Sequence, residues 1–208
     1  KFLRKNVATK TNAGAVAKVV LAKNKLKKLN YSYPVIGYSY DSNTTGAHLI
    51  KHAKRSLLAG QVIAKKNGRN LGEFIKDFKS NSPNTKIRLI GHSLGTQVIL
   101  STLEYLSKKK KNTGVVEGVY FFGASITDDV PSSKKYGKIL QNTVNKKIVN
   151  HYAPSDEVLG WANKEKFVKS PLGLGGAIGK PISKYHQILL KPKNHRFASY
   201  VSVLKKFP

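Results

Sequence analysis

The chain has 208 residues, of which 38 are lysine or arginine and 10 are aspartate or glutamate, so its formal net charge is +28. A hydrophobic fraction of 40% is that of a globular protein and excludes a chain too polar to form a core. The absence of cysteine excludes disulfide bonds and thiolate metal sites. No signal peptide is visible, and no apolar run reaches the roughly 18–20 residues of a membrane span. We therefore expect a single domain over residues 1–208, with a cytoplasmic location favoured.

The basic charge favours anionic partners, but its distribution argues against a nucleic-acid reader. Only five of the basic residues are arginine, the residue that nucleic-acid readers prefer for bidentate contacts. The lysines are scattered along the chain, as they would be on solvated faces. We therefore favour a general lysine bias over a dedicated polyanion site, with peripheral contact to an anionic membrane as the alternative role for the charge. Methionine is absent even from position 1, so we expect upstream sequence to be missing.

The predicted elements alternate between helix and strand. This alternation is typical of an α/β three-layer sandwich, with a mostly parallel sheet and helices on both faces. The expected helices cover residues 13–29, 45–66, 70–79, 96–107, 134–144 and 197–206. The expected strands cover residues 34–40, 86–90, 118–122, 147–152 and 186–190. Asn67-Gly68 is expected to end the second helix, 41–43 to form a polar turn, and 172–181 to form a glycine-rich loop.

The sequence Gly91-His92-Ser93-Leu94-Gly95 joins an apolar strand directly to an amphipathic helix. This context predicts a nucleophile elbow, in which the flanking glycines avoid collisions with the neighbouring strand and helix. Ser93 is then the nucleophile, and the backbone N–H of Leu94 is one oxyanion donor. The alternative is an ordinary tight turn that contains a serine. His92 is expected to be a packing or supporting residue, because its side chain should point away from that of Ser93.

A serine nucleophile needs a histidine base and a carboxylate that orients it. Asp156 follows the strand 147–152, and His195 lies in the loop after the last strand, so both should reach the carboxyl edge of the sheet. We therefore favour these two residues as acid and base. The alternatives are Asp128 and Asp129 for the acid, which capping would also explain, and His186 for the base. His151 is expected to be a sheet residue.

Several segments carry a family resemblance. These are Tyr38-Ser39-Tyr40-Asp41-Ser42, Leu89 to Gly95, Phe121-Phe122-Gly123-Ala124, Val149 to Gly160, and Asn194-His195. Together they resemble the poorly characterised α/β-hydrolase family typified by transmembrane and coiled-coil domain-containing protein 4 and its soluble archaeal relatives. The most diagnostic part is Ser155-Asp156-Glu157-Val158-Leu159-Gly160.

The resemblance implies an α/β-hydrolase fold that lacks its N-terminal strands, with Ser93, Asp156 and His195 as the catalytic residues. The upstream His-Gly turn that usually provides the second oxyanion donor is absent from the chain. We therefore expect Tyr38, or the turn after it, to replace that donor. The expected activity is hydrolysis of carboxylic esters, lipid esters being favoured, through an acyl-enzyme on Ser93 and without a metal or organic cofactor. The alternative is a hydrolase-like module without turnover that binds anionic lipid or another polyanion.

Overall fold

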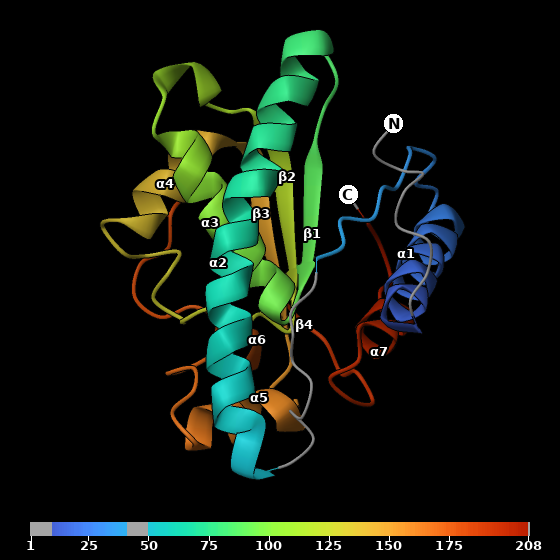
Figure 1. Cartoon of the computed structure of the whole chain (residues 1–208), viewed down its shortest axis with the longest axis vertical. Coiled ribbons are helices and arrows are strands. Elements are labelled where there is room, and N and C mark those ends of the chain that lie inside the picture. The colour runs from blue at the N-terminus through green and yellow to red at the C-terminus, as the bar shows by residue number, and fades with distance from the viewer. Residues whose placement is uncertain (1–9, 41–49, 208) are drawn as a thin grey trace.

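The computed structural model describes residues 10–40 and 50–207, in which helices cover both faces of a parallel sheet (Figure 1). The strands pair in chain order, as β1 (Arg88–His92), β2 (Val116–Phe122), β3 (Val144–Tyr152) and β4 (Tyr185–Leu189). The helices are α1 (Lys10–Lys28), α2 (Ile50–Asn81), α3 (Leu94–Ser107), the 3₁₀ helix η2 (Lys110–Asn112), α4 (Tyr136–Thr143), α5 (Glu157–Lys164), α6 (Leu172–Gly175) and α7 (Phe197–Ser202). The predicted α/β class, with three layers, is confirmed.

The sheet separates two hydrophobic cores, because successive side chains of a strand point to opposite faces. Val119 and Phe121 of β2 pack into the core that α2, α3 and α4 cover. Tyr120 and Phe122 pack into a smaller core, to which α7 contributes Tyr200. All seven residues of β2 are buried, which is typical of a parallel strand covered on both sides. In Figure 1, α1 and α7 accordingly lie on the opposite side of the sheet from α2 and α3.

Helix α2 corrects one prediction, because it runs without a break through Asn67-Gly68. A Cβ atom at Gly68 would lie 2.4 Å from the Cβ of Ser101 and 2.8 Å from the carbonyl oxygen of Val98. The missing side chain therefore lets α2 and α3 approach closely. The hydroxyl of Thr102 donates to the carbonyl of Gly68 across this contact. The packing of two helices, and not a helix end, accounts for the glycine.

The segment 34–40 is a second correction, since the structure has no strand there. No backbone hydrogen bond joins it to β1 within the described residues, so it lacks the ladder that defines a strand. Side chains hold it instead: the hydroxyl of Tyr38 donates to the carbonyl of Asn67, and Gly37 lies against Val19. The predicted turn at 41–43 and the predicted helix start at 45–49 lie outside the described residues.

The glycine-rich stretch and the last two predicted elements differ only in detail. The stretch 172–181 contains the four-residue helix α6, the last strand begins at Tyr185, and the closing helix ends at Ser202 instead of 206. Such shifts lie at element ends, where helices fray and local sequence is a weak guide.

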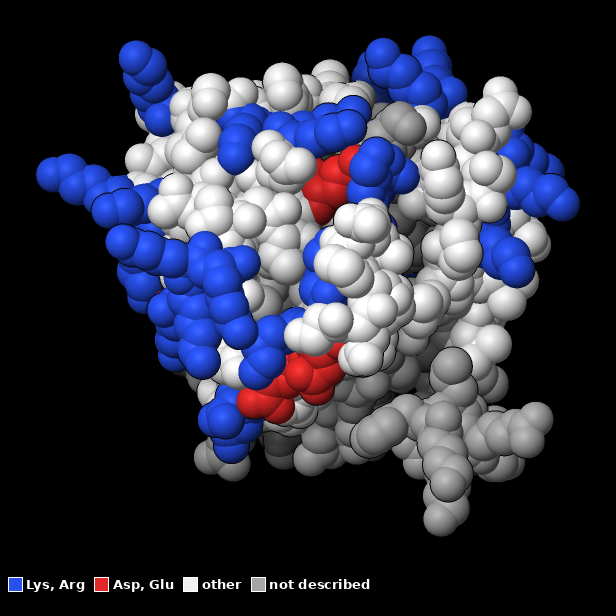
Figure 2. Space-filling view, turned by 90° about the horizontal axis from the view of Figure 1, so that it is seen from above, with Lys and Arg blue, Asp and Glu red and all other residues white. Residues whose placement is uncertain are grey.

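Basic side chains surround the end of the molecule at which the strands begin. Figure 2 views this end and shows lysine and arginine side chains around much of its edge, with few acidic ones among them and mostly uncharged residues across the middle. The buried carboxylate of Glu117 lies 2.7 Å from Arg88 and 3.3 Å from Lys146, and so joins β1, β2 and β3. The charge is distributed and not gathered into one groove in this view, as the scattered lysines predicted.

Candidate active site

Ser93 occupies a sharp turn between β1 and α3. Its φ is 53° and its ψ is −125°, a region that residues other than glycine rarely adopt. The turn is fixed by the backbone N–H of Ser93, which donates to the carbonyl of Phe122 on β2 at 3.1 Å. A strained serine between a strand and a helix is the geometry that the nucleophile elbow requires.

The two flanking glycines are not equivalent. A Cβ at Gly91 would lie 2.7 Å from the terminal carbon of Ile99 and 3.0 Å from the carbonyl oxygen of Gly95. A Cβ at Gly95 would meet no atom within 4 Å. The prediction that collisions require both glycines is therefore right for Gly91 and wrong for Gly95, because Gly95 contributes its backbone to the crowded spot and has open space at its own side-chain position.

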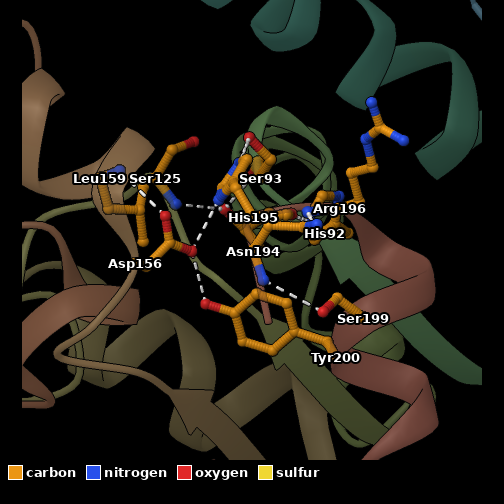
Figure 3. A network of polar contacts seen from close by, with 11 residues as sticks. His92, Ser93, Ser125, Asp156, Leu159, Asn194, His195, Arg196, Ser199 and Tyr200 are labelled. Atoms are coloured by element: carbon orange, nitrogen blue, oxygen red, sulfur yellow. Dashed lines mark hydrogen bonds and ion pairs between the residues drawn. The ribbon is translucent and has the colours of Figure 1, made fainter. Parts of the chain in front are cut away.

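The structure brings Ser93, His195 and Asp156 together (Figure 3). The hydroxyl of Ser93 lies 2.9 Å from Nε2 of His195, and Oδ2 of Asp156 lies 2.7 Å from Nδ1 of the same ring. Because a carboxylate only accepts, Nδ1 carries the proton that it donates to Asp156, and Nε2 is left to accept the proton of Ser93. The imidazole therefore has the tautomer that a general base for Ser93 needs.

Asp156 combines two roles, as a helix cap and as the partner of His195. It is the N-cap of α5, where Oδ1 accepts the backbone N–H of Leu159 at 3.1 Å. Its Oδ2 accepts from both His195 and the hydroxyl of Tyr200, the latter at 2.6 Å. Burial alone would raise the pKa of this carboxyl, but the hydrogen bonds from His195, Tyr200 and Leu159 outweigh burial and lower that pKa. The carboxylate is thus held ionised beside the imidazole.

The loop that carries His195 is fixed by contacts of its own. The ring of His92 lies 2.7 Å from the carbonyl oxygen of His195, and since a carbonyl only accepts, Nε2 of His92 is protonated. Burial, followed by the nearby His195, lowers the pKa of His92 to about 4, which keeps the ring neutral. The hydroxyl of Ser199 accepts the N–H of Asn194, whose side chain accepts the N–H of Arg196. His92 therefore supports the base, as the sequence analysis expected.

The other candidate acids and bases lie apart from this arrangement. His151 is buried in β3, where it stacks on Phe122 and Nδ1 donates to the carbonyl of Phe121. His186 is exposed on β4. Asp129 accepts from the hydroxyl of Thr127 at 2.5 Å.

Asp128 and Asp129 do not cap a helix. They lie in a run of turns that ends before α4 begins at Tyr136. Capping, which was the alternative explanation for these two aspartates, is therefore not their role, and neither has a recorded contact with His195.

The two expected oxyanion donors are placed differently. Leu94 is the first residue of α3, so its N–H has no carbonyl one turn back in the helix to receive it. The hydroxyl of Tyr38 donates to Asn67 on α2 and has no recorded contact with Ser93 or His195. The turn after Tyr38 lies outside the described residues. The N–H of Leu94 is therefore not used by the helix, and its role as an oxyanion donor, like the identity of a second donor, stays a prediction.

Three further polar residues complete the network, and the sequence analysis missed them. Tyr200 reaches Asp156, and the hydroxyl of Thr96 donates to the carbonyl of Ser93 at 2.6 Å while accepting the N–H of Ser125. The hydroxyl of Ser125 is buried without a recorded partner and points to the same end of the network as that of Ser93 (Figure 3). A tyrosine five residues after a loop histidine has no sequence signature, so only the position of α7 reveals the contact.

Among the side chains that the structure describes, in residues 16–40 and 58–207, no three His, Asp or Glu residues are grouped closely enough to hold a metal ion. None of the helices within residues 10–40 and 50–207 combines the length and the apolar character that crossing a bilayer requires.

Fold and site together define an α/β protein with a parallel sheet and a hydrogen-bonded serine, histidine and aspartate at its carboxyl edge. Residues 49–175, more than half of the chain, match a family model described as a protein of unknown function (DUF726). The chain belongs to this family. The resemblance seen in the sequence is thus confirmed at the level of a poorly characterised family. Ser93 and Asp156 lie inside the matched stretch, and His195 lies beyond it.

One curated relative extends the comparison. The chain is 36% identical over 73 residues to the uncharacterized membrane protein F35D11.3 of Caenorhabditis elegans. The match covers 35% of this chain and 11% of that protein, so the chain spans only a small part of its relative. No solved structure matches the chain significantly.

Proposed function

We propose that the chain is a serine hydrolase of the α/β-hydrolase type, which cleaves carboxylic esters through an acyl-enzyme on Ser93. The observation that carries the proposal is the position of His195, which lies 2.9 Å from the hydroxyl of Ser93 and 2.7 Å from the carboxylate of Asp156. These distances are within the reach that proton transfer to a general base requires. The backbone strain at Ser93 supports the same conclusion, because such strain persists where function needs the side chain in one position.

The reaction follows from the positions of the protons. Oγ of Ser93 attacks the ester carbonyl carbon, and its proton passes to Nε2 of His195. The N–H of Leu94 stabilises the negative charge on the carbonyl oxygen. The intermediate collapses, the alkoxide leaves with the proton from His195, and an acyl-Ser93 ester remains. Water then attacks this ester with the same base, which releases the acid and restores Ser93. Asp156 stays ionised throughout and stabilises the imidazolium.

A fluorophosphonate probe tests the proposal without knowledge of the substrate, because only an activated serine displaces its fluoride. We expect the folded chain to be labelled, and Ser93→Ala to remove the label. Ser202→Ala, at an exposed position of α7, is the matched control and should label like the wild type. A folded wild-type chain that stays unlabelled would contradict the proposal. A panel of p-nitrophenyl esters of graded chain length would then define the acyl group.

A second candidate is a module without turnover that binds anionic lipid or another polyanion, and the net charge of +28 favours it. The same charge makes lipid esters the favoured substrates of the hydrolase, since it would concentrate the protein on anionic membranes. Flotation with anionic and neutral vesicles at low and high salt tests the binding. Equal binding to both kinds of vesicle would contradict it, and labelling of Ser93 would contradict the absence of turnover.

A further inference from the structure

Tyr200 lies beneath the carboxylate of Asp156. Its side chain is fully buried, and its hydroxyl donates to Oδ2 of Asp156 at 2.6 Å. The same oxygen accepts Nδ1–H of His195 at 2.7 Å, while Oδ1 accepts the N–H of Leu159. His195, in the loop before α7, and Tyr200, in α7 itself, therefore both donate to Oδ2 of Asp156, and the backbone of Leu159 donates to Oδ1.

Packing alone does not explain a tyrosine at this position. The ring lies in the small core with Phe122 and Leu204, where phenylalanine would fill the same volume without a polar atom. A buried hydroxyl is costly unless it is hydrogen-bonded, and the partner recorded for this hydroxyl is Asp156. The backbone of Gly123 leaves room for it, because a Cβ there would lie 3.0 Å from the hydroxyl oxygen. The surroundings are thus shaped around the polar end of the side chain.

We propose that Tyr200 is a positioning residue, which fixes the Asp156 carboxylate against His195 and shares the negative charge of that carboxylate. The proposal rests on the function proposed above. With Oδ2 held by Tyr200 and Oδ1 by Leu159, the carboxylate cannot rotate away from Nδ1 of His195. The hydroxyl also withdraws charge from the oxygen that faces the imidazole, and so sets how strongly Asp156 attracts the proton on Nδ1.

The protonation states of the pair agree with these roles. Burial, followed by the hydrogen bond to Asp156, raises the pKa of Tyr200, so its hydroxyl remains protonated and can only donate to the carboxylate. The hydrogen bond from Tyr200 is in turn one of the contacts that lower the pKa of Asp156. Tyr200 therefore stays a neutral donor and Asp156 an ionised acceptor over the same range of pH.

The variant Tyr200→Phe removes the hydroxyl and keeps the ring. We expect the rate of fluorophosphonate labelling to fall roughly tenfold, as for loss of a hydrogen bond to a charged group. In an Asp156→Asn background the same substitution should change the rate by less than about twofold, because the contact it removes involves the carboxylate. Tyr120→Phe is the matched control, since Tyr120 is 3% exposed in the same core and has no recorded contact with Asp156 or His195. A loss of equal size in both backgrounds, or no loss in either, would overturn the proposal.

Proton NMR provides a readout that does not depend on turnover. The Nδ1 proton of His195, shared with Asp156, should give a resolved downfield resonance in the folded chain. Tyr200→Phe should displace it further downfield, because the carboxylate then pulls harder on this proton, whereas Tyr120→Phe should not. An unchanged resonance in folded Tyr200→Phe would refute the positioning role. If the wild-type chain is not labelled by the probe, the proposed hydrolase fails, and the resonance still decides whether Tyr200 acts on the pair.

Discussion

The ring of His92 holds the backbone of His195, with Nε2 of the one 2.7 Å from the carbonyl oxygen of the other. The residue before the serine therefore fixes the loop that carries the base. The two rings also lie 4.9 Å apart between centroids, so they pack as well as bond. His92 is the last residue of β1, and His195 lies in the loop before α7. This contact therefore links the strand that leads into Ser93 to the C-terminal part of the chain.

We expect His92→Phe to keep the packing and to lose the hydrogen bond. The carbonyl of His195 is then left without its donor, and labelling of Ser93 should fall by about tenfold, from a loss of about 1–2 kcal/mol. The labelling rate, measured beside an unfolding curve, tests this. His186→Phe, at an exposed position of β4, is the control. A folded His92→Phe variant with the wild-type rate would show that the contact is not needed.

The choice of acid and base gives the second prediction. Asp156→Asn should slow ester hydrolysis by about 10⁴-fold through loss of the correct tautomer, as the same change of the triad aspartate does in a serine protease. His195→Gln should remove activity about as completely as Ser93→Ala, since the three residues act as a unit. Asp128→Asn and Asp129→Asn should change turnover by less than about tenfold, because neither has a recorded contact with the base. A larger loss in either control would reassign the acid.

The serine itself is expected to reduce stability. Its backbone strain costs about 1–3 kcal/mol, whereas glycine adopts this region freely and costs about 0.5–1 kcal/mol in chain entropy. Ser93→Gly should therefore be more stable than Ser93→Ala by about 1 kcal/mol, while both variants lose the probe label. Urea unfolding of the two proteins measures the difference. An alanine variant as stable as the glycine variant would mean that the strain is absent in solution.

Alanine at Gly91 and alanine at Gly95 should affect the stability of the fold differently. Gly91→Ala places a methyl group 2.7 Å from Ile99 and 3.0 Å from the backbone of Gly95, so it should destabilise the fold by about 2 kcal/mol. Gly95→Ala meets open space near the start of α3 and should be neutral or stabilising by up to about 1 kcal/mol. Thermal or urea unfolding compares the two. Equal destabilisation by both would contradict the geometry.

Acid should weaken the fold through buried neutral histidines. Burial lowers the pKa of His151 to about 4, whereas in the unfolded chain it titrates near about 6.5. Between these values the unfolded state binds more protons, so the free energy of unfolding falls as the pH drops from about 6.5 towards 4. The fall contributed by His151 amounts to at most about 3 kcal/mol. His92 adds in the same window, while the lowered pKa of Asp156 matters only below about 3.8.

His151→Asn, which keeps a side-chain donor near Phe121, should reduce the slope of stability against pH between 4 and 6.5. Urea unfolding at several pH values measures this slope, with His186→Asn at an exposed position as the control. An unchanged slope in His151→Asn would show that the ring is not held neutral in the folded state.

Much of the fold and three of the site residues were predictable from the sequence. The alternation of helices and strands, the serine between β1 and α3, and the positions of Asp156 and His195 just past two strands are local features of the chain. In a parallel sheet, such positions lie at one edge, so local pattern and chain order were enough to place them. The course of α2 through Gly68 was not predictable, because glycine signals both a helix end and a close helix contact.

Tertiary structure alone decided the rest. Segment 34–40 has the composition of a strand, but a strand needs a partner. The segment instead packs Gly37 against Val19 of α1 and binds α2 through the hydroxyl of Tyr38. The hydrogen bonds of His92 to His195 and of Tyr200 to Asp156 join residues that are distant in the chain. The open space beside Gly95 depends on how α3 packs. Sequence determines the preferences of each segment for strand, turn and helix. Whether two side chains, such as those of His195 and Tyr200, donate to the same carboxylate oxygen depends on how the packed helices orient them. No local sequence pattern encodes this orientation.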